Sequence, residues 1–321
     1  MEEKKKTARE IIEGYDGPPV RIMEVCGTHT HEIFRLGIRK LLPEQVELIS
    51  GPGCPVCVTQ VGSIDEAIYL ALERQVTICT FGDLVRVPGT NMSLAGAREK
   101  GAKIRIVYSP VDAKEYAKEH PKEQVTFLSV GFETTTPSAC LSVKKAREEG
   151  LTNYSILTAN KTMPQAYEAL KGSADIFLYP GHVNAITGTK LCEELAKEGV
   201  SGVVAGFTAK ELLTALAVAL ARFQEGRPFF VNCYPRVVTE NGSPQAQKLV
   251  EEMMEPCDSE WRGLGVIKGS GMRLQEEWSA FDARKKYKIP LIQGKANPAC
   301  RCGDVLQGKC KPSDCKVFGK V

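Results

Sequence analysis

Short runs of apolar, often β-branched residues alternate with longer amphipathic segments along most of the chain. The apolar runs occupy residues 20–25, 46–50, 76–81, 103–109, 124–130, 153–159, 175–180 and 201–207. Between them, apolar residues recur at helical spacing, as in THEIFRLGIRKLL after the first run and TAKELLTALAVALARF after the last. Strands that alternate with helical crossovers form parallel sheets covered by helices. The pattern therefore predicts an α/β fold with two parallel-sheet domains of four strands each.

The eight runs form two consecutive series, which we interpret as two domains. The first covers residues 1–120 and contains the loops with Cys26 and with Cys54 and Cys57, and the second covers residues 121–225. The first strand of each series leads into a loop that opens a helix, CGTHTHE in one case and GFETTTP in the other. This similarity suggests an internal duplication. Residues 226–321 predict a small irregular region of helix and loops, whose Cys-rich end has too little apolar content to form its own core.

Loops at the carboxyl ends of parallel strands are the usual ligand sites of open α/β sheets. Four loops occupy such positions: those with Cys26 and with Cys54 and Cys57, GFETTTP at 131–137 and PGHVNAITG at 180–188. If the two sheets face each other, we expect these loops to line one cleft. GFETTTP could bind an anion through its threonines and backbone amides, or simply start a helix.

Charge and composition exclude some classes of function. The net charge is +3 with acidic and basic residues interleaved, so we expect no nucleic-acid or membrane partner. The N-terminal residues lack the apolar core of a signal peptide, and the most apolar run, 212–223, is too short to span a bilayer. These features predict a cytoplasmic protein.

The 321 residues include twelve cysteines, which is many for a reducing compartment. Clustered cysteines there are typical of metal sites or redox chemistry rather than of structural disulfides. Five are scattered singly and are expected to be small buried apolar residues. The other seven form three groups: Cys26, the pair Cys54 and Cys57, and the tail residues Cys300, Cys302, Cys310 and Cys315.

Cys26 lies at a predicted junction between a strand and a helix. Backbone N–H groups at the helix start would favour its thiolate, so we predict a nucleophile or metal ligand. His29 and His31 could act as bases, hydrogen-bond donors or ligands, or could be plain surface residues beside a threonine cap. His182, in PGHVNAITG, is either functional or a buried polar partner.

The other two groups suggest further chemistry. CPVC has the spacing of a redox-active dithiol formed by Cys54 and Cys57, although half of a zinc site or inert turn cysteines would also fit. The irregular spacing of the tail cysteines suits an iron–sulfur cluster, while zinc or free thiols are the alternatives.

Together these motifs resemble one family over essentially the whole chain, namely HypD, a maturation factor of [NiFe]-hydrogenases. The resemblance rests on CGTHTHEIFRLGI, GPGCPVCVT, FGDLVRVPGT, VGFETTTP, YPGHVNAITG and NPACRCGDVL. It implies two α/β domains and a C-terminal region with a [4Fe–4S] cluster.

The resemblance also implies a role in assembling the Fe(CN)2CO unit of the hydrogenase. The transient iron would be held by Cys26 together with a small HypC-type partner, with His29 and His31 near enough to orient it or move protons. A HypE-type partner would present cyanide as an enzyme-bound thiocyanate, whose release needs two electrons. These would pass from the cluster to Cys54 and Cys57 and then to the iron. The implied protein is a redox-active assembly scaffold rather than a free-standing enzyme.

Within the family, the cluster cysteines correspond to Cys300, Cys302 and Cys315, with a fourth further along. The fourth ligand would then be either Cys310 or a cysteine beyond Val321. Two rival functions remain: a free-standing thiol–disulfide oxidoreductase using Cys54 and Cys57, and a binding module with a zinc-stapled tail.

Overall fold

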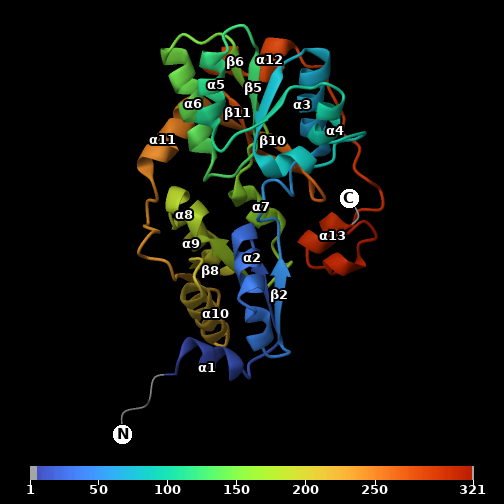
Figure 1. Ribbon diagram of the computed structural model, residues 1–321. Helices are drawn as coiled ribbons and strands as arrows, with labels where there is room; N and C mark the ends of the chain where they lie inside the picture. Colours follow the sequence, from blue (N-terminus) through green and yellow to red (C-terminus); the bar gives the residue numbers. More distant parts are fainter. Residues whose placement is uncertain (1–5, 320–321) are drawn as a thin grey trace. The chain divides into compact units, whose positions relative to one another are not determined.

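The computed structural model describes residues 6–319 and divides the chain into two compact units (Figure 1). The first unit takes in the chain up to Cys54, Tyr167–Pro244 and Gly303–Lys311. The second takes in Pro55–Ala166, Gln245–Cys302 and the chain from Pro312 onward. The two units are therefore interleaved along the sequence.

All eight predicted strands are present. They are β1 (Val20–Glu24), β2 (Val46–Ser50), β3 (Thr77–Thr80), β4 (Ile104–Ile106), β5 (Val125–Ser129), β6 (Tyr154–Thr158), β7 (Ile176–Pro180) and β8 (Ser201–Ala205). The first unit has a parallel sheet in the order β2-β1-β7-β8-β9, where β9 is Phe230–Asn232. The second has a parallel sheet in the order β4-β3-β5-β6 and an antiparallel hairpin of β10 (Met254–Trp261) and β11 (Gly265–Leu274). The α/β class with parallel sheets is confirmed.

The predicted domain ranges do not coincide with these units. Ile22 of β1 pairs with Ile176 of β7, so the first sheet joins strands from the ranges 1–120 and 121–225. The second sheet likewise joins β3 and β4 to β5 and β6. Residues 226–321 also contribute to both units. An apolar run identifies a strand but not its neighbour in the sheet. The strands at the two ends of the series, β1, β2, β7 and β8, share one sheet, and the middle strands β3 to β6 share the other. The predicted internal duplication is not shown, because each sheet contains strands from both predicted series.

Helices surround both sheets. Those of the first unit are α1 (Ala8–Glu13), α2 (Gly27–Arg35), α8 (Gly181–Thr187), α9 (Lys190–Lys197) and α10 (Ala209–Phe223), with the 3-10 turn η1 (Ile38–Leu41). The second unit has α3 (Val61–Glu73), α4 (Leu94–Glu99), α5 (Pro110–Glu119), α6 (Thr136–Glu148), α12 (Ala283–Tyr287), η2 (Gly82–Arg86), η3 (Glu276–Phe281) and η4 (Pro312–Asp314). Three helices cross the division between the units: α7 (Met163–Ala169), α11 (Pro244–Met253) and α13 (Cys302–Leu306).

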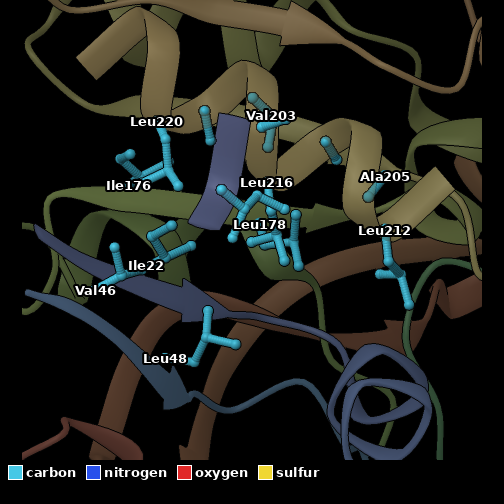
Figure 2. Packing of buried hydrophobic residues seen from close by; sticks show 14 of the residues in the cluster. Ile22, Val46, Leu48, Ile176, Leu178, Val203, Ala205, Leu212, Leu216 and Leu220 are labelled. Carbon is cyan, nitrogen blue, oxygen red and sulfur yellow. The ribbon is translucent and has the colours of Figure 1, made fainter. Parts of the chain in front are cut away.

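The core of the first unit forms where α10 covers its sheet. A capping box of Thr208 and Glu211 starts the helix, so that its first amides are satisfied. Its apolar side chains then pack on those of the central strands, as Figure 2 shows. The labelled residues are Ile22, Val46, Leu48, Ile176, Leu178, Val203, Ala205, Leu212, Leu216 and Leu220. This packing fixes β1, β7 and β8, whose carboxyl ends carry the candidate site.

The second unit has a core on each face of its sheet. Every residue of β5 is buried, and neighbouring side chains point to opposite faces. Phe127 packs with residues of α5 and α6, whereas Leu128 packs with residues of α3 and α4. A sheet covered on both sides explains why the sequence of β5 is apolar without alternation.

Candidate functional site

Cys26 occupies the N-cap of α2, directly beyond the carboxyl end of β1. Its extended backbone, with φ −151° and ψ 121°, turns the chain from strand to helix. The backbone N–H groups of Thr28 and His29, at the start of the helix, act to lower the pKa of its thiol, in the direction that the sequence predicts. Burial outweighs them, since Cys26 is only 9% exposed, and the pKa is raised overall. The site thus disfavours a bare thiolate, and binding of a cation would release the proton.

The loop that carries Cys54 lies directly against the Cys26 turn. Gly27 donates its N–H to the carbonyl of Gly53 at 2.9 Å, and Gly51 donates to the carbonyl of Glu24, also at 2.9 Å. A β-carbon on Gly53 would lie 2.1 Å from the nitrogen of Cys26. Only glycine permits this approach, which explains the GPGC sequence. Cys26 and half-buried Cys54 therefore occupy adjacent turns of the first unit.

His29 is buried on the inner face of α2. Its Nε2 lies 3.3 Å from the carbonyl of Ala205 and 3.1 Å from that of Gly206, beyond β8. Carbonyls only accept hydrogen bonds, so Nε2 carries a proton and donates it. Burial lowers the pKa of His29 to about 4, and the ring is neutral near pH 7. Its Nδ1 then has a lone pair, and this buried atom has no hydrogen-bond partner among the residues described.

His182 lies on α8, beyond the carboxyl end of β7, and shares an aromatic neighbour with His29. The ring of Phe207 stacks on His182 at 3.9 Å between centroids and lies 4.8 Å from the ring of His29. Desolvation lowers the pKa of His182, although the residue remains largely exposed. Two neighbouring strands, β1 and β7, thus bring Cys26, His29 and His182 to the same edge of the sheet, where Phe207 follows β8.

His31 does not join this group. Its side chain is 70% exposed, and its nearest ionic neighbour is Glu32, with Nε2 and Oε1 3.9 Å apart. The interpretation of His31 as a surface residue agrees with this position.

Glu24 is a feature of the site that the sequence analysis missed. Its side chain is fully buried at the end of β1, where Arg39 lies 2.6 Å away and the Ser50 hydroxyl donates at 3.3 Å. Burial raises the pKa of its carboxyl group, while Arg39 opposes the rise. The signal was a lone acid in the apolar run VRIMEV. The Ser50 hydroxyl and Arg39, which also donates to the carbonyl of Leu48, thus connect the ends of β1 and β2, from which the Cys26 and Cys54 turns leave.

The GFETTTP loop belongs to the second unit and begins α6. The hydroxyls of Thr135 and Thr136 donate to the carbonyl of Phe132 at 3.2 and 2.9 Å, as expected for a helix start. Glu133 accepts the N–H of Met163 at 2.8 Å, while its other oxygen is buried without a partner among the described residues. Burial raises the pKa of Glu133 to about 7.

The redox and tail cysteines are divided between the units. Exposed Cys57 belongs to the second unit with Cys300, Cys302 and Cys315, whereas Cys310 belongs to the first. Cys315 accepts the N–H of Arg301 at 3.4 Å and also interacts with the Cys300 thiol, and these contacts lower its pKa. Within residues 6–319, no three His, Cys, Asp or Glu side chains are grouped closely enough to hold a metal ion. The structure thus pairs two of the predicted ligands, Cys300 and Cys315.

Comparison with known proteins gives a consistent result. A profile of the HypD family, described as the hydrogenase formation hypA family, matches residues 2–321. The chain is 40% identical to the hydrogenase maturation factor HypD of Cupriavidus necator, over 96% of this chain and 85% of that protein. It is 42% identical to the factor of the same name from Escherichia coli, over 94% and 83%. A putative hydrogenase expression/formation protein of Methanocaldococcus jannaschii is 39% identical, over 94% and 85%.

No helix in the described part of the chain has the length and apolar character needed to cross a membrane. The residues matched by the profile include the Cys26 turn, the CPVC loop and the tail. The chain therefore belongs to the HypD family of hydrogenase maturation proteins.

Proposed function

We propose that this protein is a redox-active scaffold on which the Fe(CN)2CO unit of a [NiFe]-hydrogenase is assembled, and that it is not a free-standing enzyme. The observation that carries the proposal is the Cys26 turn. A buried thiol there occupies the N-cap of a helix, whose first N–H groups favour its thiolate, and it lies beside the loop of a second thiol, Cys54.

Cys26 is the proposed ligand of the iron, which is cargo of the protein. A thiolate is a soft ligand suited to low-spin iron with cyanide and CO, and the helix N–H groups offset part of its charge. With a pKa of about 4, His29 is protonated in only about one molecule per thousand at pH 7. It therefore acts as a neutral acceptor through Nδ1 and orients groups near Cys26, and it does not store protons.

Cys54 and Cys57 are the proposed source of two electrons. Reduction of an enzyme-bound thiocyanate breaks its S–C bond and gives a thiol and cyanide. The two cysteine thiols become a disulfide in the same step and release two protons, one of which goes to the new thiol. The exposure of Cys57 supports this role, because a dithiol must be reached by its reaction partner.

A resident [4Fe–4S] cluster fits the tail in its donor chemistry. Cys300, Cys302 and Cys315 would hold it, with Cys310 or a cysteine beyond Val321 as the fourth ligand, and the approach of Cys300 to Cys315 supports this set. Such a cluster supplies electrons one at a time when bound.

Two partners are proposed on the basis of family membership. A small HypC-type protein would share the iron with Cys26. A HypE-type protein would deliver cyanide.

The test is iron retention. We would isolate the complex with the HypC-type partner without oxygen, and measure iron together with the infrared bands of bound cyanide and CO. Cys26→Ala should remove both iron and bands, while Cys233→Ala, which changes another non-tail cysteine of the first unit, should leave them. An iron-loaded Cys26→Ala complex would refute the assignment.

The exposed Cys57 also supports a second candidate, a general thiol–disulfide oxidoreductase. That function requires reduction of insulin disulfides by the isolated chain with dithiothreitol. Absence of this turnover, together with iron retention by the complex, would leave only the scaffold.

A further inference from the structure

Arg262 is held at the tip of the β10–β11 hairpin by contacts on both sides. The preceding residue, Trp261, is fully buried, stacks on Phe132 at 5.7 Å and donates its indole N–H to Ser270 at 2.8 Å. The backbone N–H of Arg262 donates to the carbonyl of Val58 at 2.9 Å. The hairpin tip is therefore attached to the residue directly after Cys57.

The Arg262 side chain makes two further bonds to backbone carbonyls. Its Nε donates to Thr59 at 3.0 Å and its Nη2 to Pro88 at 3.1 Å. The guanidinium thus connects the loop after Cys57 to Pro88, in the segment that follows η2. A planar fork can make both bonds at once, which a lysine cannot.

The tail reaches the same region of the second unit. A β-carbon on Gly294 would lie 2.2 Å from the nitrogen of Gly62, so this segment runs closely along the start of α3. Lys295 donates its N–H to the hydroxyl of Thr90 at 2.9 Å. Six residues after Gly294 the chain reaches Cys300.

The charge of Arg262 acts on thiols of two segments, the Cys57 loop and the tail. It interacts electrostatically with Cys302, Cys300 and Cys57, and with the carboxylate of Asp65. Burial lowers the pKa of Arg262, an effect that these neighbours oppose. A cation beside a cysteine favours its thiolate, which is the reactive form.

We propose that Arg262 is a positioning residue for the thiol chemistry of this protein: its side chain fixes the Cys57 loop, and its positive charge activates Cys57. The purpose of this activation rests on the proposed function, but its chemistry does not, because it needs neither iron nor a partner.

The test compares Arg262→Gln and Arg262→Lys with the unchanged chain. Each protein is reduced, treated with chelator and desalted, and the alkylation of Cys57 by iodoacetamide at pH 7.5 is followed by mass spectrometry of its peptide. Arg74→Gln is the matched control, because Arg74 also belongs to the second unit and donates to a backbone carbonyl, that of Tyr287, at 2.7 Å. Thermal unfolding of each variant establishes that it is folded.

Arg262→Gln should react roughly three- to tenfold more slowly at Cys57, since tenfold corresponds to one pKa unit of the thiol. Arg262→Lys should react at a rate closer to that of the unchanged chain, and Arg74→Gln should not differ from it. An unchanged rate in Arg262→Gln would overturn the proposal. Equal slowing by Gln and Lys would overturn the activation by charge, because the effect would then come only from the loop geometry that a lysine also fails to hold. Loss of iron from the partner complex would test the scaffold separately.

Discussion

Gly53→Ala should break the contact between the two thiol-bearing turns of the first unit. The added β-carbon would lie 2.1 Å from the nitrogen of Cys26 and 2.3 Å from its α-carbon, and both are backbone atoms that cannot rotate away. The loop must retreat by about 1 Å or more to reach ordinary contact distance, which takes its 2.9 Å hydrogen bonds beyond bonding range.

The cost follows from the two backbone bonds that this retreat breaks. Gly27 loses its acceptor on Gly53, and Gly51 loses its acceptor on Glu24. A buried polar group left without a partner costs ~1–3 kcal/mol, so the pair is worth ~2–6 kcal/mol. The loss is local, because the core around α10 lies elsewhere in the unit.

Amide hydrogen exchange at Gly27 measures this directly. A local loss of 2 kcal/mol corresponds to exchange about 30-fold faster in Gly53→Ala. Gly82→Ala is the control, since a β-carbon there would meet only the Ile106 side chain at 3.5 Å. If Gly27 exchanged equally slowly in both variants, the two turns would not depend on each other and the reasoning would fail.

Two further predictions concern buried ionisable groups of the same unit. Arg39→Met should destabilise the protein by ~3 kcal/mol in urea unfolding, because it leaves the Glu24 carboxylate buried without its cation. Adding Glu24→Gln to this variant should recover most of the loss. Equal stability of the single and double variants would contradict this. His29 has a folded pKa of about 4 against 6.5 when unfolded, so only the unfolded state takes up the proton as the pH falls through this window. Stability should then fall by roughly 3 kcal/mol from this group between those values and be unaffected by it above pH 6.5. His29→Gln should lose less stability than the unchanged chain between pH 7.5 and 4.5, and parallel losses in the two proteins would show that His29 is not neutral when folded.

The sequence was informative about strands and much less about their partners. The eight apolar runs all form strands, and a central strand such as β5 is continuously apolar because both of its faces are buried. Pairing is a tertiary property, and nothing in β1 indicates β7 rather than β3. The strand β10 was missed because MEPCDSEW carries a proline and alternating polar residues, which favour a connector.

The candidate site was predicted to a similar extent. The rule that ligands lie at the carboxyl ends of strands selected the turns of Cys26, Cys54 and His182, and the structure places these turns directly after β1, β2 and β7. The two histidines of THTH could not be distinguished, because residues two apart point to nearly opposite sides of a helix and either could face inward. His29 is the histidine that faces inward, because its ring contacts the carbonyls of Ala205 and Gly206, which come from a distant part of the chain. Glu24 was overlooked because its partner Arg39 lies in a separate element.

The interleaving of the two units has a consequence for the order of events during synthesis. Arg21, in β1, donates to Asp175, which precedes β7, and these residues are 154 positions apart. At about 5–20 residues per second, roughly 8–30 s pass between the synthesis of β1 and that of β7, its second neighbour in the sheet. The strands β3 to β6 emerge without interruption during that interval and can pair at once. We therefore expect the parallel sheet of the second unit to form on the ribosome first. The turn that bears Cys26 gains its remaining neighbours only after β7 and β8 have been synthesised.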